Sequence, residues 1–180
     1  AAPGVGRFAR LPHIVRALES AIAREGGRVD VLMLSGGEPT VHPEVLEIIE
    51  AATERNVVRV ILNTNGIRIA KDARFADALG RLRGRLEVYL QFDGFELDSH
   101  LYHRGEDLRA IKAEAIRRLA DRHVFTTLAV AVAEGVNDGE VGAIADYALE
   151  TDFIAGVAFQ PVFGSGRANA IDPMRWCWWW

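Results

Sequence analysis

The sequence predicts an α/β fold in which parallel strands alternate with helices. Short apolar runs recur five times along the 180 residues, and the first four are each followed by a polar loop and then by a pattern with helical spacing. A strand that continues through a helical crossover places the next strand parallel to it, in a right-handed connection. The alternation therefore predicts a parallel sheet, either open and doubly wound or curved toward a barrel.

The first predicted element is a helix over residues 11–24. Ile14, Leu18 and Ile22 recur on one face, which is the spacing of an amphipathic helix. Two glycines follow, as is common at a helix C-terminus. No predicted strand precedes this helix, so we expect that the chain starts after the first strand of its fold.

Strands and helices then alternate along the chain. The apolar run VDVLML at residues 29–34 suits a strand that is buried on both faces, and Pro43 suits the first turn of a helix over residues 43–56. The remaining predicted elements are strand 57–63 with a weaker helix near 71–82, strand 86–92 with helix 106–122, strand 124–132 with helix 138–150, and a fifth strand at 154–162. No internal repeat or linker interrupts them, so residues 1–167 are predicted to form one domain.

Composition narrows the class of protein. With 49% hydrophobic and 26% charged residues, the chain is expected to form one soluble globular core. The net charge is −4 and the arginines are scattered, so no nucleic acid partner is expected. No apolar run approaches the roughly 18–20 residues of a membrane span, and the N-terminus lacks the layout of a secretion signal. We therefore expect no membrane span and a cytoplasmic location.

The C-terminus differs from the rest of the chain. It reads RWCWWW and holds all four tryptophans together with Cys177, the one cysteine. We treat residues 168–180 as a tail of unknown or aberrant origin and assign it no function. A single cysteine excludes an internal disulfide and any multi-cysteine metal site built from this chain alone.

Polar loops gather at one predicted rim of the sheet. In such folds the ligand lies outside the carboxyl ends of the strands, and those ends carry SGGEPT, NTNG, QFDG, AEGVND and QPV. In the first loop, Gly36 and Gly37 leave the backbone bare, so that carbonyl oxygens can approach a cation. Glu38 adds a negative charge and Pro39 stiffens the turn, so the natural guest is an ammonium group. The alternative is a tight turn in which Glu38 only favours the start of a helix.

The next two strand ends offer further polar side chains. Asn63, Thr64 and Asn65 form a short turn before a glycine, and in such turns asparagines commonly bond their own backbone. Gln91 and Asp93 alternate with an apolar residue, so both point to one side of their strand, where two polar groups can hold vicinal hydroxyls. The alternative is a strand that ends in a solvated turn.

Other polar residues have two interpretations each. Gln160, expected to be buried between apolar neighbours, needs a hydrogen-bond partner, either a ligand or the backbone. His100 and His103 have a spacing that metals tolerate, but no third ligand is placed to complete a site, so no metal is predicted. Lys112, together with Arg104, either meets an anionic substrate or faces solvent, and we favour solvent.

The order of these motifs resembles a known family. SGGEP, NTNG and QFDG at successive strand ends are similar to the core of the radical S-adenosylmethionine (SAM) superfamily, over residues 28–167. The resemblance implies a partial TIM-type (β/α) barrel with five strands present and the first strand of the family absent. That strand, with the CxxxCxxC motif that follows it in the family, is expected upstream of Ala1. The stretches LQFDGF, HRGEDLRAIKAEAI, GVND and FQPV are similar to the branch of tetraether lipid synthase and of methyltransferases that act on pterins.

The resemblance also implies a cofactor, a reaction and partners. The family cleaves SAM reductively with a 4Fe-4S cluster to give a 5′-deoxyadenosyl radical, which here would serve C–C bond formation or methylation of an unknown small-molecule or lipid substrate. The cluster would not be bound by this chain, and a partner such as ferredoxin or flavodoxin would supply the electron in the full-length enzyme. The residues implied in SAM binding are Gly36, Gly37, Glu38, Pro39, Asn63, Thr64, Asn65, Gln91, Asp93 and Gln160. The alternative is a non-catalytic α/β module that binds a nucleotide or a partner.

Overall fold

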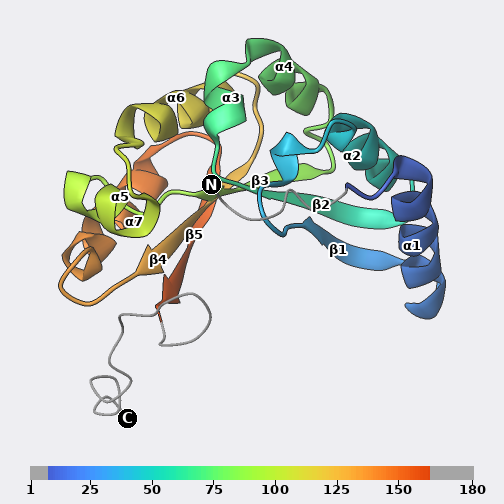
Figure 1. Cartoon of the computed structure of the whole chain (residues 1–180), viewed down its shortest axis with the longest axis horizontal. Helices are drawn as coiled ribbons and strands as arrows, with labels where there is room; N and C mark the ends of the chain where they lie inside the picture. The colour runs from blue at the N-terminus through green and yellow to red at the C-terminus, as the bar shows by residue number, and fades with distance from the viewer. Residues whose placement is uncertain (1–7, 163–180) are drawn as a thin grey trace, which may run out of the picture.

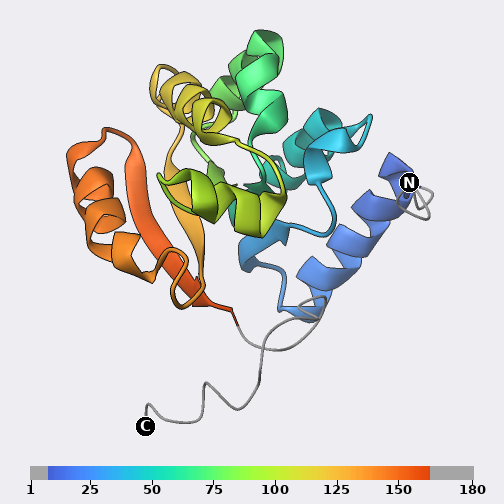
Figure 2. The ribbon, with the colours of Figure 1, turned by 60° about the vertical axis from the view of Figure 1, so that its left-hand side comes forward.

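One five-stranded sheet organises residues 8–162, the part of the chain that the computed structural model describes. Its strands lie in the order β1-β2-β3-β4-β5, and each neighbouring pair is parallel. The sheet is curved, and the helices follow its outer side from α1 at one end to α7 at the other (Figures 1 and 2). The predicted parallel α/β sheet is therefore confirmed, and it is curved into half a barrel.

Strands and helices alternate along the chain. The strands are β1 (Val29–Leu34), β2 (Val57–Thr64), β3 (Leu86–Gln91), β4 (Thr126–Val132) and β5 (Ile154–Pro161). The α-helices are α1 (Leu11–Arg24), α2 (Val45–Thr53), α3 (Ile67–Lys71), α4 (Ala73–Arg81), α5 (Leu97–Arg104), α6 (Arg109–Ala120) and α7 (Val141–Glu150). Two short 3-10 helices are η1 (Pro39–Val41) and η2 (Asp138–Glu140). None of the helices in this described part of the chain is both long and apolar enough to cross a membrane.

All the predicted helices after the first differ in their bounds from the observed ones, α6 and α7 by up to three residues at an end. Residues near 71–82 belong to two helices, α3 and α4, because Asp72 between them has an extended backbone. The Asp72 carboxylate accepts a hydrogen bond from Phe75 N at 3.1 Å and so caps the start of α4. Pro43 precedes α2, which starts only at Val45.

Helix α5 is absent from the predicted elements. Its apolar residues Leu97 and Leu101 are exposed, whereas its buried face carries Ser99 and His100, both at 0% exposure. An apolar stripe is the signal by which sequence patterns reveal a helix, and α5 buries polar groups instead. Gly105, in the left-handed conformation, ends it.

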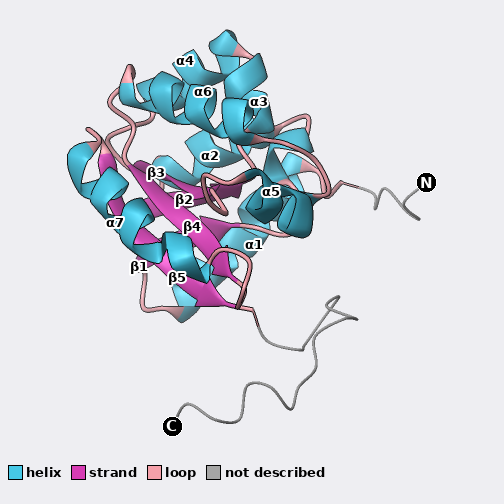
Figure 3. Cartoon of the chain, turned by 90° about the vertical axis from the view of Figure 1, so that its left-hand side faces the viewer, coloured by secondary structure: helices cyan, strands magenta, loops and turns pink. Residues whose placement is uncertain are grey.

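The outer face of the sheet carries the hydrophobic core. Val60, Leu62, Val88, Leu90 and Leu128 are all at 0% exposure. They pack beneath the helices, and Figure 3 shows α3, α4 and α6 stacked on one side of the strands. Because successive side chains of a strand point to opposite faces, the residues between them face the inner, concave side.

The inner face of the same strands carries several polar side chains, beside Ile61 and the alanines of β4. Glu87 on β3 accepts a hydrogen bond from the Thr127 hydroxyl at 2.6 Å and lies 3.3 Å from an Arg59 guanidinium nitrogen. These three residues occupy the middle of the concave side. Toward the carboxyl ends of the strands this face leads to Asn63 and Gln91, where the sequence predicts a site.

Candidate functional site

Glu38 ties the carboxyl ends of β1 and β2 together. Its Oε1 accepts hydrogen bonds from the Thr40 backbone N at 3.1 Å and from the hydroxyls of Thr40 and Thr64 at 2.6 and 2.7 Å. Its Oε2 accepts one from Asn65 N at 2.8 Å. Oε2 has two lone pairs and accepts a single hydrogen bond, so it keeps room for one further donor. The side chain therefore shapes the loop and retains one acceptor position.

The loop at Gly36 and Gly37 is bare and open. Both glycines are exposed, and no atom lies within 4 Å of the position that a Cβ would take at either one. Gly36 has φ 131°, a region that favours glycine. Among residues 8–162, no hydrogen bond engages the backbone of Gly36 or Gly37. Their carbonyl oxygens are available to a cation, and Pro39 then starts η1.

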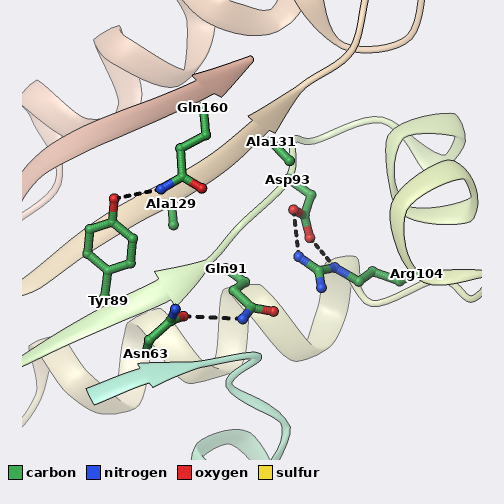
Figure 4. A pocket seen from close by; sticks show the side chains of 8 residues that line it. All are labelled: Asn63, Tyr89, Gln91, Asp93, Arg104, Ala129, Ala131 and Gln160. Carbon is green, nitrogen blue, oxygen red and sulfur yellow. Dashed lines mark hydrogen bonds and ion pairs between the residues drawn. The ribbon is translucent and has the colours of Figure 1, made fainter. Parts of the chain in front are cut away.

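A cavity of about 190 Å³ opens on the inner face at the carboxyl ends of β2, β3 and β4 (Figure 4). It is lined by Asn63, Tyr89, Gln91, Asp93, Arg104, Ala129, Ala131 and Gln160. Gln91 Nε2 donates to Asn63 Oδ1 at 3.2 Å, and Gln160 Nε2 donates to the Tyr89 hydroxyl at 3.2 Å. Three carboxamides and a phenol thus meet opposite the small alanine side chains of β4.

An ion pair closes one side of this cavity. Arg104 donates through Nε and a terminal nitrogen to the two carboxylate oxygens of Asp93, at 2.6 and 2.8 Å. The Asp93 side chain is 1% exposed and that of Arg104 is 27% exposed. Such two-point pairs fix both partners in orientation as well as in distance. Arg104 therefore presents a partly exposed cation whose position is set by a buried acid.

Lys112 supports the site from the helical side. It is 1% exposed, so the predicted solvent-facing lysine was wrong. Its Nζ donates to the carbonyl oxygen of Asn65 at 2.8 Å and to that of Gln91. Burial lowers the pKa of Lys112 to about 8, while the Asp93 carboxylate acts in the opposite direction. Lys112 consequently holds the carboxyl ends of β2 and β3 together.

The two histidines are part of the supporting structure. His100 is fully buried, and its Nε2 lies 3.0 Å from the carbonyl oxygen of Gly94, so Nε2 carries the proton. Burial is the main cause that lowers the pKa of His103. Within residues 8–162, no group of three or more His, Cys, Asp or Glu side chains could hold a metal ion.

Beyond the loop at residues 36–39, the structure separates the predicted site residues into two groups. Asn63, Gln91, Asp93 and Gln160 line one cavity. The expected burial of Gln160 was wrong, because the residue is exposed and bonds Tyr89.

The other group is engaged within the protein. The Thr64 hydroxyl donates to Glu38, and the Asn65 side chain accepts from Ile67 N at 2.9 Å at the start of α3. Asn65 therefore bonds nearby backbone, as asparagine turns commonly do.

Two polar residues of the cavity, Tyr89 and Arg104, are missing from the sequence prediction. Tyr89 lies two residues before Gln91 on β3, so strand alternation could have placed it on the same face. Arg104 was considered only as a possible contact of an anionic substrate. Its partner Asp93 lies eleven residues earlier, beyond a turn and most of α5, and no local pattern reveals that pairing.

Comparisons with known proteins point to one family. A family model described as "Radical SAM superfamily" matches residues 1–148. A 7,8-dihydro-6-hydroxymethylpterin dimethyltransferase of Methanocaldococcus jannaschii is 36% identical over 140 residues, which make up 77% of this chain and 27% of that protein. A solved structure of hexahistidine-tagged anSMEcpe with bound AdoMet has a TM-score of 0.65 and 21% identity, covering 87% of this chain and 45% of that chain. The chain thus spans less than half the length of either protein, and the second likeness supports the fold alone.

Proposed function

Because the chain belongs to the radical SAM superfamily, we propose that the carboxyl ends of β1, β2 and β3 bind SAM. The observation that carries the proposal is the cavity in which Asn63, Gln91 and Asp93 meet from two strand ends. The bare loop at Gly36 and Gly37 follows the neighbouring strand, β1, which pairs with β2. SAM has two matching parts, an amino acid end with an ammonium group and a ribose with two hydroxyls.

The loop after β1 suits the ammonium end. Carbonyl oxygens of Gly36 and Gly37 are free of partners within the described residues, and Oε2 of Glu38 accepts only one hydrogen bond. An ammonium group has three donors and no acceptor, so a set of oxygens is what it requires. The Glu38 charge strengthens this contact, because hydrogen bonds between ionised groups are the stronger ones.

The cavity suits the ribose. The Gln91–Asn63 hydrogen bond is long, at 3.2 Å, and it leaves the Asn63 amide nitrogen and the Gln91 amide oxygen without a partner within residues 8–162. A hydroxyl both donates and accepts, so a donor and an acceptor side by side can hold it. Asp93 offers further acceptor capacity at the same wall.

Arg104 suits the carboxylate of the methionine part. It is the one cation among the residues that line the cavity, and 27% of its side chain is exposed. A guanidinium has five donors in a planar fork, so it can bind Asp93 and still offer donors to a second carboxylate. We therefore assign Arg104 a binding role beside the residues that the sequence predicts.

This chain's residues do not fit an iron–sulfur cluster. Such clusters are held by cysteine thiolates, and the sequence has one cysteine, Cys177, which lies outside the described residues. We therefore propose that these 180 residues bind SAM, and that the cluster ligands and the reductant come from outside them. In the complete enzyme, SAM bound here would supply a 5′-deoxyadenosyl radical for methylation or C–C bond formation on a small-molecule or lipid substrate. The pterin dimethyltransferase among the relatives supports methyl transfer.

Calorimetric titration of the 180-residue chain with SAM tests the proposal. Gly37→Val fills the approach to the loop carbonyls and is expected to weaken binding at least about tenfold, or about 1.4 kcal/mol. The added side chain meets no atom within 4 Å of its Cβ, and Gly37 lacks a positive φ, so the fold should tolerate it.

Gly84→Val is the matched control. Gly84 is also exposed, has open space at its Cβ position and lacks a positive φ, but it precedes β3 at the opposite rim. Its affinity for SAM should equal that of the unsubstituted chain. Equal losses in both variants, or no binding by the unsubstituted chain, would refute the proposed site.

A further inference from the structure

The turn formed by Asp93 and Gly94 has a positive φ at both residues. Asp93 has φ 71° and Gly94 has φ 147°. The first value lies in the left-handed region, which only a few per cent of non-glycine residues adopt, although Asp does so more often than most. Asp93 is nevertheless fully buried, paired with Arg104, and part of the cavity wall. Contacts from outside the turn must hold it in place.

Asn137 supplies the first of these contacts. It lies in the segment between β4 and α7, and it is 1% exposed. Its Nδ2 donates to the carbonyl oxygens of Asp93 and Ala131, at 2.7 and 2.8 Å. Its Oδ1 accepts from Ala133 N at 2.8 Å. The side chain thus joins the turn after β3 to the end of β4.

Glu140 supplies the second contact. Its carboxylate accepts hydrogen bonds from the backbone N of Phe95, from that of Glu96 at 3.1 Å, and from the Ser99 hydroxyl. These donors surround the start of α5, where backbone N–H groups lack partners within the helix. A Cβ at Gly94 would lie 2.6 Å from Glu140 Oε1, so glycine is what allows the carboxylate this close.

We propose that Asn137 and Glu140 are positioning residues of the SAM site, which hold the Asp93-Gly94 turn so that the Asp93 carboxylate faces Arg104 and the cavity. Neither residue lines the cavity. The inference rests on the proposed function and adds to it that affinity is controlled from the segment between β4 and α7. Asn137 fixes the carbonyl of Asp93 and Glu140 fixes the residues that follow, so together they determine the direction of the side chain between them.

The first test is SAM titration of Asn137→Ala and Glu140→Ala in the 180-residue chain. Each is expected to bind about tenfold more weakly than the unsubstituted chain. Asp138→Ala is the matched control, because Asp138 lies in the same segment, is exposed, and accepts a hydrogen bond only from Gly135 N at 2.9 Å within the described residues. Its affinity should not change. Unchanged affinity in Glu140→Ala would overturn the inference.

A double-mutant cycle separates positioning from general destabilisation. If Glu140 acts through Asp93, Glu140→Ala should weaken binding less than about twofold further in an Asp93→Ala background. The same loss in both backgrounds would overturn the inference. Glu140→Gln should restore affinity to within about threefold, because an amide oxygen still accepts from the two backbone N–H groups.

A measurement without ligand keeps this test independent of the proposed function. The Arg104 Nε–H donates to buried Asp93 at 2.6 Å, so its exchange with solvent, followed by nuclear magnetic resonance, should be slow. In Glu140→Ala it should speed up about tenfold or more. If the unsubstituted chain binds no SAM but this acceleration occurs, the proposed function fails and the positioning role stands. If the exchange rate of the Arg104 Nε–H in Glu140→Ala equals that of the unsubstituted chain, the positioning role is refuted. This outcome does not depend on whether Asn137→Ala folds.

Discussion

The outer and inner faces of the sheet share one backbone but carry opposite chemistry. On β3, Val88 and Leu90 point outward and are at 0% exposure, whereas Tyr89 and Gln91, which alternate with them, line the cavity. Fully burying an aliphatic side chain contributes roughly 1.5–3 kcal/mol to stability. The amide and phenol pairs of the inner face are long and partly exposed, and each such hydrogen bond contributes about 0.5–1.5 kcal/mol.

Because of this difference, residues that stabilise the fold alternate along β3 with residues that are available to a ligand. The outer face commits its side chains to the helices, and the inner face leaves amide donors and acceptors without partners among residues 8–162. A substitution should therefore affect mainly the free energy of unfolding on one face and mainly ligand affinity on the other. Lys112 and Glu38 connect the two faces at the carboxyl ends of the strands. A substitution at either one should therefore affect both the free energy of unfolding and the ligand affinity.

The largest effect is expected from Leu90→Ala. Truncation of a fully buried leucine leaves a cavity and should lower the free energy of unfolding by about 2–5 kcal/mol. Gln91→Ala, one residue later on the inner face, should lower it by less than about 1.5 kcal/mol. Urea unfolding of both variants measures the contrast. Equal destabilisation would show that the inner face also carries the fold.

The second effect concerns Lys112 and pH. Burial lowers its pKa from 10.5 to about 8, so the unfolded chain binds more protons than the folded chain between these values. The free energy of unfolding should therefore rise with pH across this window, by on the order of 3 kcal/mol in total. A neutral amine still has two donors for the carbonyls of Asn65 and Gln91.

Lys112→Met removes this titration and both hydrogen bonds. Its stability relative to the unsubstituted chain should fall as the pH rises from about 7.5 to about 10, by roughly 2–3 kcal/mol. Lys71→Met is the matched control, because it also replaces a lysine by methionine but at an exposed position. Urea unfolding at the two pH values measures these free energies. If Lys112→Met differs from the unsubstituted chain by the same amount at both pH values, the buried lysine keeps an ordinary pKa.

The third effect concerns Glu38→Gln, which keeps the shape of the side chain and removes its charge. Binding of SAM should weaken by roughly 1.5–3 kcal/mol, the range for hydrogen bonds to charged groups. 5′-Deoxyadenosine lacks the amino acid part and should be affected less. Calorimetry with both ligands measures the difference. If both weaken alike, Glu38 acts only through its bonds to Thr64 and Asn65.

The smallest effect is expected from Tyr89→Phe. It removes the hydroxyl that accepts from Gln160 at 3.2 Å, a contact to an exposed side chain. The free energy of unfolding should change by less than about 0.5 kcal/mol and SAM affinity by less than about threefold. A loss of tenfold or more in affinity would give this pair a direct role in the site.

The sequence by itself determined the strands, their parallel direction and the rim where polar residues gather. Apolar runs, glycine turns and helical spacing are local patterns, and the handedness of strand–helix–strand connections turns them into a parallel sheet. Whether that sheet is open or curved toward a barrel was left to the family resemblance and to the structure. The same patterns missed α5, because its buried face holds Ser99 and His100. They also joined α3 and α4, because the cap formed by Asp72 is a matter of backbone conformation that apolar spacing does not report.

Tertiary structure alone decided which polar residues share the cavity and which support it. Asn63 and Asn65 have the same side chain and stand two apart, yet the first lines the cavity and the second accepts a hydrogen bond from Ile67 N at the start of α3. The burial of Lys112, the exposure of Gln160 and the left-handed Asp93 likewise depend on segments far away in the chain. The physical reason is that the burial and bonding of a polar group depend on what packs against it, and only the folded chain brings those neighbours together.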